Sequence, residues 1–116
     1  MAITKTTPSV ATHGFIVNAV SSDASGCEEV LAAVAGKQIK IRFLSISSDA
    51  AISITIGEGE TGGAVTTALI GPVPFGANQT LRWYFKPYLV LTAGVALVVD
   101  TSGPGNICIV VQGVIN

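Results

Sequence analysis

Residues 34–57 read VAGKQIKIRFLSISSDAAISITIG, and apolar residues alternate there with polar ones. Ile39, Ile41 and Phe43 share one side of an extended chain, while Lys40 and Arg42 share the other. This two-residue period is typical of a strand with one buried face. The residues SSDAA are typical of a turn, and ISITI repeats the alternation after them. The stretch therefore predicts two strands joined as a β-hairpin with one buried face.

The alternation shifts phase by one residue after Phe43. Leu44 and Ile46 are apolar, whereas Ser45 and Ser47 are polar. A shift of one residue turns every later side chain to the opposite face, unless an extra residue absorbs it. We therefore expect a β-bulge, or the passage of a strand from one sheet to another, near Phe43–Leu44.

Similar segments recur along the chain at intervals of about ten residues, with turn residues between them. The expected strands cover residues 13–20, 28–34, 37–47, 52–56, 64–70, 80–85, 95–100 and 106–115, and 87–91 is a further candidate. This spacing predicts an all-β fold, an antiparallel β-sandwich that is jelly-roll-like and has about eight strands. An immunoglobulin-like sandwich is the alternative, but Cys27 and Cys108 are far apart and Trp83 is not midway between them.

The length and composition predict one domain with an interaction surface. The 116 residues fit a single domain over residues 1–116, in which residues 1–12 form a flexible arm or a loose terminus. Charged residues make up only 11% of the chain and hydrophobic residues 49%. So few charges leave apolar surface exposed on a monomer, and such surface normally marks a contact site. We therefore expect a homo-oligomer, either a dimer or a trimer, or a component of a larger assembly.

The charge balance argues against a polyanionic partner. Six Lys and Arg residues stand against seven Asp and Glu, for a net charge of −1. Nucleic-acid-binding proteins instead cluster basic residues against the phosphates. The uncharged window 61–81 is interrupted by glycines and prolines, and the first residues lack the charged-then-apolar order of a secretory signal. We expect neither a nucleic-acid nor a membrane partner.

One glycine motif is interpreted as a loop. Residues 57–62 read GEGETG and match G-x-G-x-x-G, but a β-prone segment follows where a dinucleotide site needs a helix. Glu58 and Glu60 would also repel phosphate, so we expect a flexible acidic hairpin loop. Calcium binding by these two glutamates is the alternative, although two carboxylates seldom suffice. We expect no cofactor and no metal ion.

Catalytic chemistry has little support in the sequence. His13 is the only histidine, and a catalytic triad would have to combine it with a serine and with Asp49 or Asp100. No nucleophile motif accompanies it, so we expect no enzymatic activity. Cys27 and Cys108 are interpreted as two buried thiols, with a disulfide between them as the alternative.

The segment Arg82–Lys86 (RWYFK) concentrates residue types that dominate protein interfaces. In a strand, Trp83 and Phe85 would face the core and the intervening residues would face outward. The candidate protein-contact residues are Arg82, Tyr84, Lys86 and Tyr88.

Four segments resemble small bacteriophage virion proteins. They are VAGKQIKIRFLSIS (34–47), AISITIG (51–57), IGPVPFGANQTL (70–81) and TAGVALVVDTSGPGNICIVVQGVI (92–115), within a resemblance that spans residues 28–115. The matching positions imply structural roles rather than active ones: Gly36, Lys37, Ile39, Gly71, Pro72, Asn78, Gly94, Leu97, Thr101 and Gly103.

The resemblance implies a jelly-roll-like decoration or cement protein that stabilises a phage head through protein–protein contacts. Its partner would be the major capsid protein or another virion protein. Its location would be the outer capsid surface, after assembly in the host cytoplasm. The alternative is a carbohydrate- or receptor-binding tip domain of a fibre or spike. Such a domain needs an exposed aromatic among polar loop residues, here Tyr84 or Tyr88 with Asp49, Glu58, Glu60 and Asn78.

Overall fold

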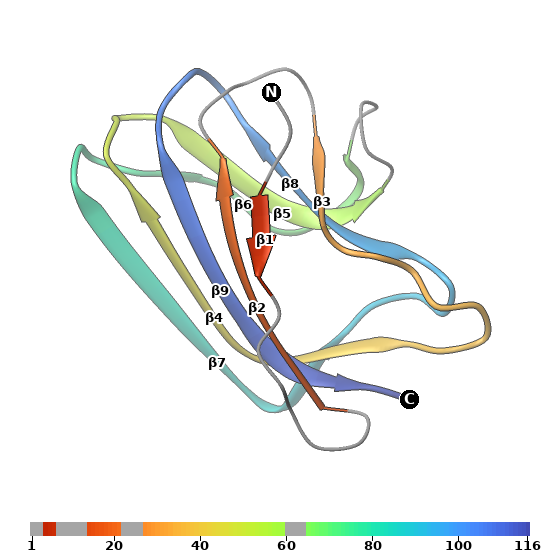
Figure 1. Ribbon diagram of the computed structural model, residues 1–116. Helices are drawn as coiled ribbons and strands as arrows, with labels where there is room; N and C mark the ends of the chain where they lie inside the picture. The colour runs from red at the N-terminus through yellow and green to blue at the C-terminus, as the bar shows by residue number, and fades with distance from the viewer. Residues whose placement is uncertain (1–3, 7–13, 22–26, 60–64) are drawn as a thin grey trace.

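The computed structural model describes residues 4–6, 14–21, 27–59 and 65–116, which form nine strands and no helix (Figure 1). The strands are β1 (Thr4–Thr6), β2 (Gly14–Ser21), β3 (Glu28–Leu31), β4 (Ile39–Ser48), β5 (Ser53–Gly59), β6 (Val65–Pro74), β7 (Gln79–Val90), β8 (Ala96–Thr101) and β9 (Ile107–Ile115). In this part of the chain no segment forms a helix that could cross a membrane.

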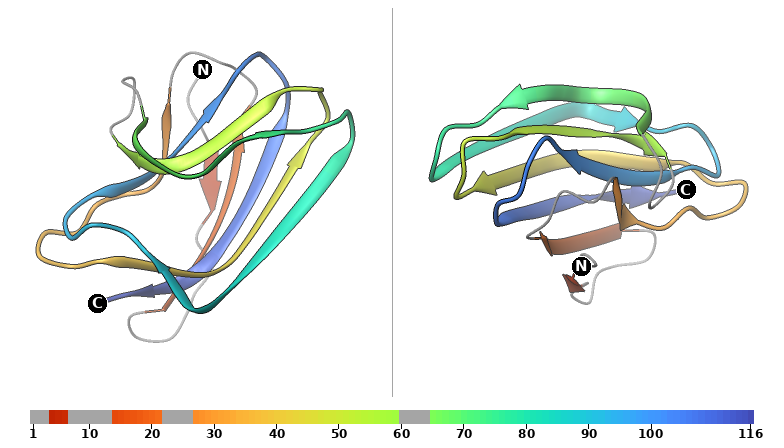
Figure 2. Two further views of the ribbon diagram at one scale, coloured as in Figure 1. Left: turned by 180° about the vertical axis from the view of Figure 1, so that it is seen from behind. Right: turned by 90° about the horizontal axis from the view of Figure 1, so that it is seen from above.

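The strands form two antiparallel sheets that pack as two layers (Figures 1 and 2). The five-stranded sheet has the order β1-β2-β9-β4-β7, and the four-stranded sheet has the order β3-β8-β5-β6. From β2 to β9 the strands pair from the two ends of the sequence toward its middle. The first pair is β2–β9, and β3–β8, β4–β7 and β5–β6 follow. A single long hairpin that is doubled over and rolled up gives this order. The predicted all-β sandwich with jelly-roll topology is confirmed.

The core lies between the inner faces of the two sheets. On β4, Ile39, Ile41, Leu44 and Ile46 are almost completely buried, and they belong to the same hydrophobic cluster as Ile56 of β5 in the opposite sheet. Alternate residues of β4 face outward, as the two-residue period of a strand requires. The apolar residues that predicted the strands are therefore the residues that hold the two layers together.

The expected bulge is present, one residue earlier than predicted. The pairing of β4 with both β9 and β7 shifts between Ile41 and Phe43, so Arg42 is the extra residue on β4. Phe43 then faces outward and is only half-buried, while Leu44 returns to the core. The neighbouring strand β7 carries its own larger irregularity opposite Arg42, over residues 85–88.

The predicted hairpin between the two strands of residues 34–57 is wrong. Strand β4 lies in the five-stranded sheet and β5 in the four-stranded sheet, and the turn at residues 49–52 carries the chain from one layer to the other. Both strands have one apolar face, and these two faces pack against each other across the core instead of lying side by side. Alternation identifies a buried face but leaves open which sheet it belongs to.

Several strand boundaries differ from the expected ones. Strand β3 ends at Leu31, β6 continues beyond Gly71 to Pro74, and residues 80–85 and 87–91 belong largely to one strand, β7. Strand β5 runs through Glu58 to Gly59, so Glu58 lies in a strand and not in the expected acidic loop, whose other residues from 60 to 62 are outside the described part of the chain. Glu60 and His13 lie outside the described residues.

Four positions within the sequence resemblance, three in turns or loops and Gly71 inside β6, have a left-handed backbone conformation. Gly36, Gly71 and Gly94 have φ values of 72°, 98° and 74°, and Asn78 has a φ of 58°. Glycine and asparagine tolerate this left-handed region better than other residues. The backbone at these four positions therefore favours glycine or asparagine.

Candidate functional site

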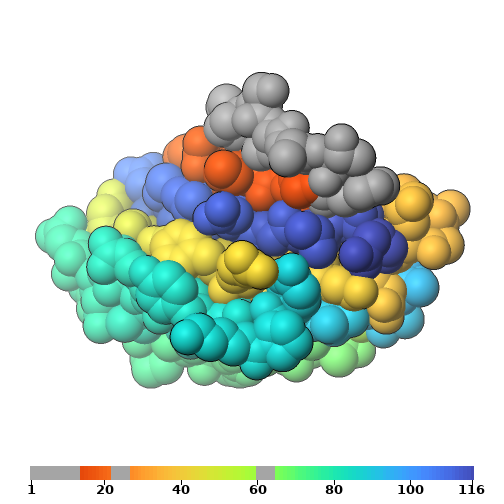
Figure 3. Space-filling model, turned by 90° about the horizontal axis from the view of Figure 1, so that it is seen from below, coloured from red at the N-terminus to blue at the C-terminus, as the bar shows by residue number. Residues whose placement is uncertain are grey.

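The outer face of the five-stranded sheet is open, because the second sheet covers only its inner face and no other described element forms a layer over it. Figure 3 shows its strands as successive bands, β2, β9, β4 and β7. The pairing registers place outward side chains in rows across these strands. One row is Ile16–Gln112–Phe43–Tyr84, the next is Asn18–Val110–Ser45–Arg82, and the third is Val20–Cys108–Ser47–Thr80.

Tyr84 is the most prominent aromatic residue of this face. Its side chain is 71% exposed, and its ring centroid lies 5.0 Å from that of Phe43 with an interplanar angle of 51°. A tilted aromatic pair of this kind is favourable and fixes the orientation of both rings. Tyr84 is therefore exposed to solvent and at the same time packed beside the Phe43 ring of the neighbouring strand.

Arg42 reaches the same area from the bulge in β4. Its guanidinium carbon lies 5.3 Å from the centre of the Tyr88 ring, and its Nη2 donates a hydrogen bond of 3.2 Å to the Tyr88 hydroxyl. A cation over an aromatic ring is an attractive contact. Arg42 also lines two adjoining hollows, one of about 300 Å³ with Tyr84 and Lys86, and one of about 200 Å³ with Tyr88 and Gln112.

The structure places the four predicted contact residues along one strand. Arg82, Tyr84 and Lys86 are exposed and Tyr88 is half-buried, while Trp83 and Phe85 pack against the core as expected. Lys40 and Arg42 of β4 were not among the predicted contact residues, and strand pairing brings them beside β7. We call Lys40, Arg42, Arg82, Tyr84, Lys86 and Tyr88 together the basic–aromatic face.

Charge is divided between the two sheets. Every Lys and Arg on a described strand belongs to the five-stranded sheet, and every Asp and Glu on a described strand belongs to the four-stranded sheet. On β4 and β7 the basic residues are Lys40, Arg42, Arg82 and Lys86. The net charge of the chain is therefore close to zero although the outer face of this sheet is positive. A charged partner responds to this local charge and not to the net charge.

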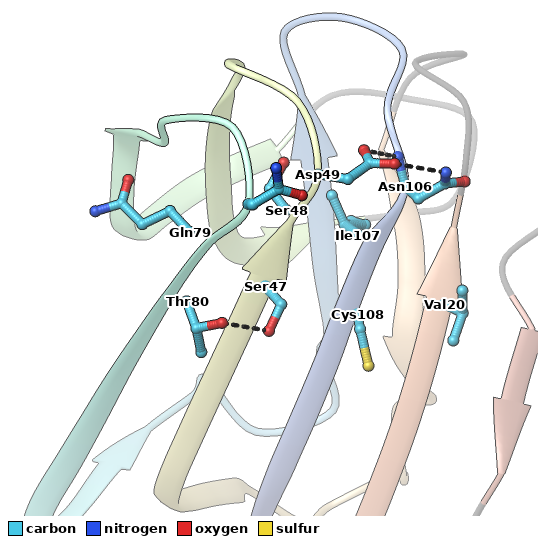
Figure 4. Close-up of a pocket in the computed structure, with 10 residues that line it drawn as sticks. Val20, Ser47, Ser48, Asp49, Gln79, Thr80, Asn106, Ile107 and Cys108 are labelled. Atoms are coloured by element: carbon cyan, nitrogen blue, oxygen red, sulfur yellow. Dashed lines mark hydrogen bonds between the residues drawn. The ribbon is translucent and has the colours of Figure 1, made fainter.

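A third hollow, of about 300 Å³, lies at the end of the same sheet, where the turns after β4, β6 and β8 meet (Figure 4). Across its floor, Val20, Cys108, Ser47 and Thr80 lie in one row, and the Ser47 and Thr80 hydroxyls are 2.9 Å apart. Polar side chains line its rim. We call this the polar hollow.

Asp49 ties two turns together at the rim of the polar hollow. Its two carboxylate oxygens accept hydrogen bonds from the Asn106 backbone N–H at 2.8 Å and from Asn106 Nδ2 at 2.7 Å. The side-chain bond first, and the backbone bond second, lower the pKa of the Asp49 carboxyl below its ordinary value. The Asp49 carboxylate therefore links the turn after β4 to the turn after β8.

The residues proposed for a carbohydrate site are only partly brought together. Asp49 and Asn78 both line the polar hollow, but Tyr84 and Tyr88 line the other two hollows. Glu58 is only 6% exposed, on the four-stranded sheet. Its carboxylate accepts hydrogen bonds from the backbone N–H of Thr92 and, at 3.1 Å, from the Thr92 hydroxyl. Glu58 therefore fastens the β7–β8 loop and is not a loop ligand.

The two cysteines differ in exposure. Cys27 is buried, but Cys108 occupies an outward position of β9 and is exposed, and no disulfide joins these two described residues. The prediction that both thiols are buried is therefore wrong for Cys108. Its cause is the register of β9, which turns even-numbered residues at this end of the strand away from the core.

The described residues contain no group of three or more His, Cys, Asp or Glu side chains that could hold a metal ion. Comparison with protein families, with curated proteins and with solved structures finds no match for the chain. The candidate surfaces are therefore characterised by their own geometry and chemistry.

Proposed function

We propose that the chain is a structural protein of a phage particle, of the decoration or cement type, which binds another virion protein through the outer face of its five-stranded sheet. The virion setting is suggested by the sequence resemblance. The single observation that supports a binding role is the open face around Tyr84, whose exposed ring packs beside Phe43 and lines a hollow together with Arg42 and Lys86. Tyr and Arg are the residue types that most often dominate binding energy at protein interfaces.

The sheet edges are poorer candidates for the contact. Strands β1 and β3 contain only three and four residues. The other two edge strands carry prolines, Pro72 and Pro74 on β6 and Pro87 on β7, which lack the N–H that strand addition uses. Proteins blunt their edges in these ways to prevent unwanted pairing. The proposed contact is therefore made by side chains of a sheet face rather than by backbone at an edge.

The proposed contact needs only part of the surface that the chain exposes. A stable protein–protein contact covers about 800 Å² on each partner, and the chain exposes 5727 Å². Repeated over many copies on a shell, even a contact with a modest free energy stabilises the assembled state, because each bound copy adds its own contribution.

The proposed virion role is tested on purified phage particles. Phage particles from a host that carries the gene are purified on a density gradient, analysed by mass spectrometry, and labelled with antibodies against the chain for electron microscopy. We expect the chain in the particle fraction and the label on the head surface. A chain that remains in the soluble fraction, or label confined to the tail, would contradict the proposal.

Self-association is tested by native mass spectrometry over a dilution series. We expect a dimer or trimer that persists at the lower concentrations, because the low charge content leaves apolar surface to be covered. A monomer at every concentration would remove the homo-oligomer from the proposal and leave the contact with another virion protein.

A receptor-binding tip domain is the second candidate, and the polar hollow favours it. Its rim brings hydrogen-bonding side chains from three turns to one place, as in many sites for small polar ligands. A glycan array with the wild-type chain and an Asn78→Ala variant tests this function. Signals that are lost in the variant would support it, and an array without signals would remove it.

A further inference from the structure

The basic–aromatic face carries positive charge with no carboxylate side chain beside it on the described strands of its sheet. Lys40, Arg42, Arg82 and Lys86 come from two paired strands, β4 and β7. No Asp or Glu occupies any described strand of that sheet. Unpaired surface charges of one sign attract partners of the opposite sign and raise the rate of association.

The Arg42 side chain is oriented by Tyr88 and keeps hydrogen-bond donors available for a ligand. One N–H of the Arg42 guanidinium bonds to the Tyr88 hydroxyl and its plane lies near the ring, which limits the number of side-chain conformations. Its other N–H groups make no hydrogen bond with any described residue, and the side chain is exposed. A guanidinium offers a planar fork of donors that matches a carboxylate. Little conformational entropy is lost when such a group binds.

The surroundings favour a protein partner over a nucleic acid. The neighbouring rows contain Ile16, Val110 and Val20, the last 48% exposed, together with hydroxyl and amide side chains. Apolar side chains gain free energy against apolar protein surface and gain none against phosphates. Only Tyr84 is exposed enough to stack on a base, whereas single-strand binders use several aromatic residues along a positive groove.

Building on the proposed function, we propose that the basic–aromatic face binds an acidic surface of another protein. In this arrangement Tyr84 occupies an apolar site on the partner, and Arg42, Arg82 and Lys86 meet carboxylates around it. The occupant is thus identified by its chemistry, as a protein segment in which Asp or Glu residues surround an apolar position.

The test uses a chemical probe and a matched variant. The probe is a synthetic twelve-residue peptide of Glu, Leu and Ala, and its control has Gln in place of every Glu. Each is titrated into the full, ¹⁵N-labelled chain, and amide shifts are followed by NMR. The variant is Arg82→Gln/Lys86→Gln, and the control variant is Lys37→Gln, which removes an exposed charge from the β3–β4 loop. All of these side chains are exposed, so the variants are expected to fold.

We expect the Glu peptide to shift amides of β4 and β7 around Arg42 and Tyr84, and the Gln peptide to bind about tenfold more weakly or not at all. Removal of two exposed charges should weaken binding of the Glu peptide about fivefold, and Lys37→Gln should leave it unchanged. Added salt should weaken binding in the wild type.

Five results would overturn the inference, and the first four concern the peptides and the oligonucleotide. They are no binding of either peptide, equal binding of both, shifts that lie outside the basic–aromatic face, or tighter binding of a twelve-nucleotide oligothymidine than of the Glu peptide. A fifth is a concentration-dependent mass that Arg82→Gln/Lys86→Gln abolishes, because the face would then bind the acidic sheet of a second copy.

The particle experiment separates this inference from the proposed function. If the Arg82→Gln/Lys86→Gln variant still attaches to heads with wild-type occupancy, the chain is a virion protein and the inference about its face is wrong. If the peptide results hold but the chain is absent from particles, the face binds acidic protein surfaces and the virion role is wrong.

Discussion

Replacement of Gly113 by alanine tests whether the close approach of β9 to β4 at the bulge is required for stability. A Cβ atom added at Gly113 would lie 1.9 Å from the carbonyl oxygen of Lys40 and 3.0 Å from the Cα of Ile41. Both are backbone atoms of a paired strand, so no side-chain rotation relieves the overlap. The neighbouring strands β9 and β4 must instead move apart beside the position where Arg42 bulges.

The expected cost combines two contributions. Overpacking that displaces backbone costs about 1–3 kcal/mol, and one or two weakened ladder hydrogen bonds add about 1 kcal/mol each. The lower entropy of an unfolded chain with alanine returns about 0.5–1 kcal/mol. The net loss in the free energy of unfolding therefore lies between about 1 and 4.5 kcal/mol, and the middle of each range gives about 3 kcal/mol. With an unfolding entropy of about 2.1 cal/mol/K per residue, 1 kcal/mol corresponds to about 4 °C in this chain, so the middle value lowers Tm by about 12 °C.

The assay is urea and thermal unfolding of wild type and Gly113→Ala, followed by fluorescence of Trp83, the only tryptophan of the chain, which packs against the core. The matched control is Gly103→Ala, whose added Cβ would lie 3.6 Å from the nearest atom, a methyl carbon of Ile52, which is an ordinary contact. If the free energy of unfolding of Gly113→Ala lies within about 1 kcal/mol of that of the control, β9 and β4 do not approach each other as closely as the structure indicates.

Three further outcomes follow from contacts at the ends of the sheets. Glu58→Ala should lower the free energy of unfolding by about 2–3 kcal/mol, because a buried carboxylate with two hydrogen bonds to the β7–β8 loop is lost; an unchanged urea midpoint would show that the loop does not depend on it. The pKa of Asp49, followed by NMR of its carboxyl carbon, should lie below the ordinary value of about 3.9 and rise toward it in Asn106→Ala. Because the folded pKa is the lower one, this contribution to stability is fully present above the ordinary pKa and is lost as the pH falls through the folded value. In the native protein one thiol, that of Cys108, should react quickly with Ellman's reagent, while Cys27 reacts only on unfolding; two fast thiols would contradict the burial of Cys27.

The strands and the inward aromatics could be predicted because their signal is local. Alternation places Trp83 and Phe85 on one side of β7 and Tyr84 on the other, whatever the neighbouring strand is. The phase change on β4 likewise predicted a bulge. It did not identify Arg42 as the extra residue, because a phase change is equally consistent with a bulge at any of several adjacent positions.

The partners of each strand could not be predicted in the same way. Lys40 and Arg42 lie beside Arg82 only because β4 pairs with β7. These two strands are separated in the sequence by β5 and β6, which belong to the other sheet. The predicted position of Glu58, in a loop, was wrong for a related reason. The glycine before it, Gly57, suggested a loop, but in β5 it allows β6 to approach, since an added Cβ would lie 2.3 Å from a β6 carbonyl oxygen.

The doubled-over hairpin also sets an order on biosynthesis. Strand β2 lies between β1 and β9, and its residues from Gly14 to Ser21 pair with the residues of β9 from Val114 back to Ile107. On a ribosome that adds about 5–20 residues per second, β2 is made early and must wait for β9, whereas β5 and β6 can pair as soon as both have emerged. Nascent chains that are stopped before β9 should therefore expose the apolar side of β2 and need protection from aggregation. Completion of the fold is tied to arrival of the last strand, which fills the central position of the sheet.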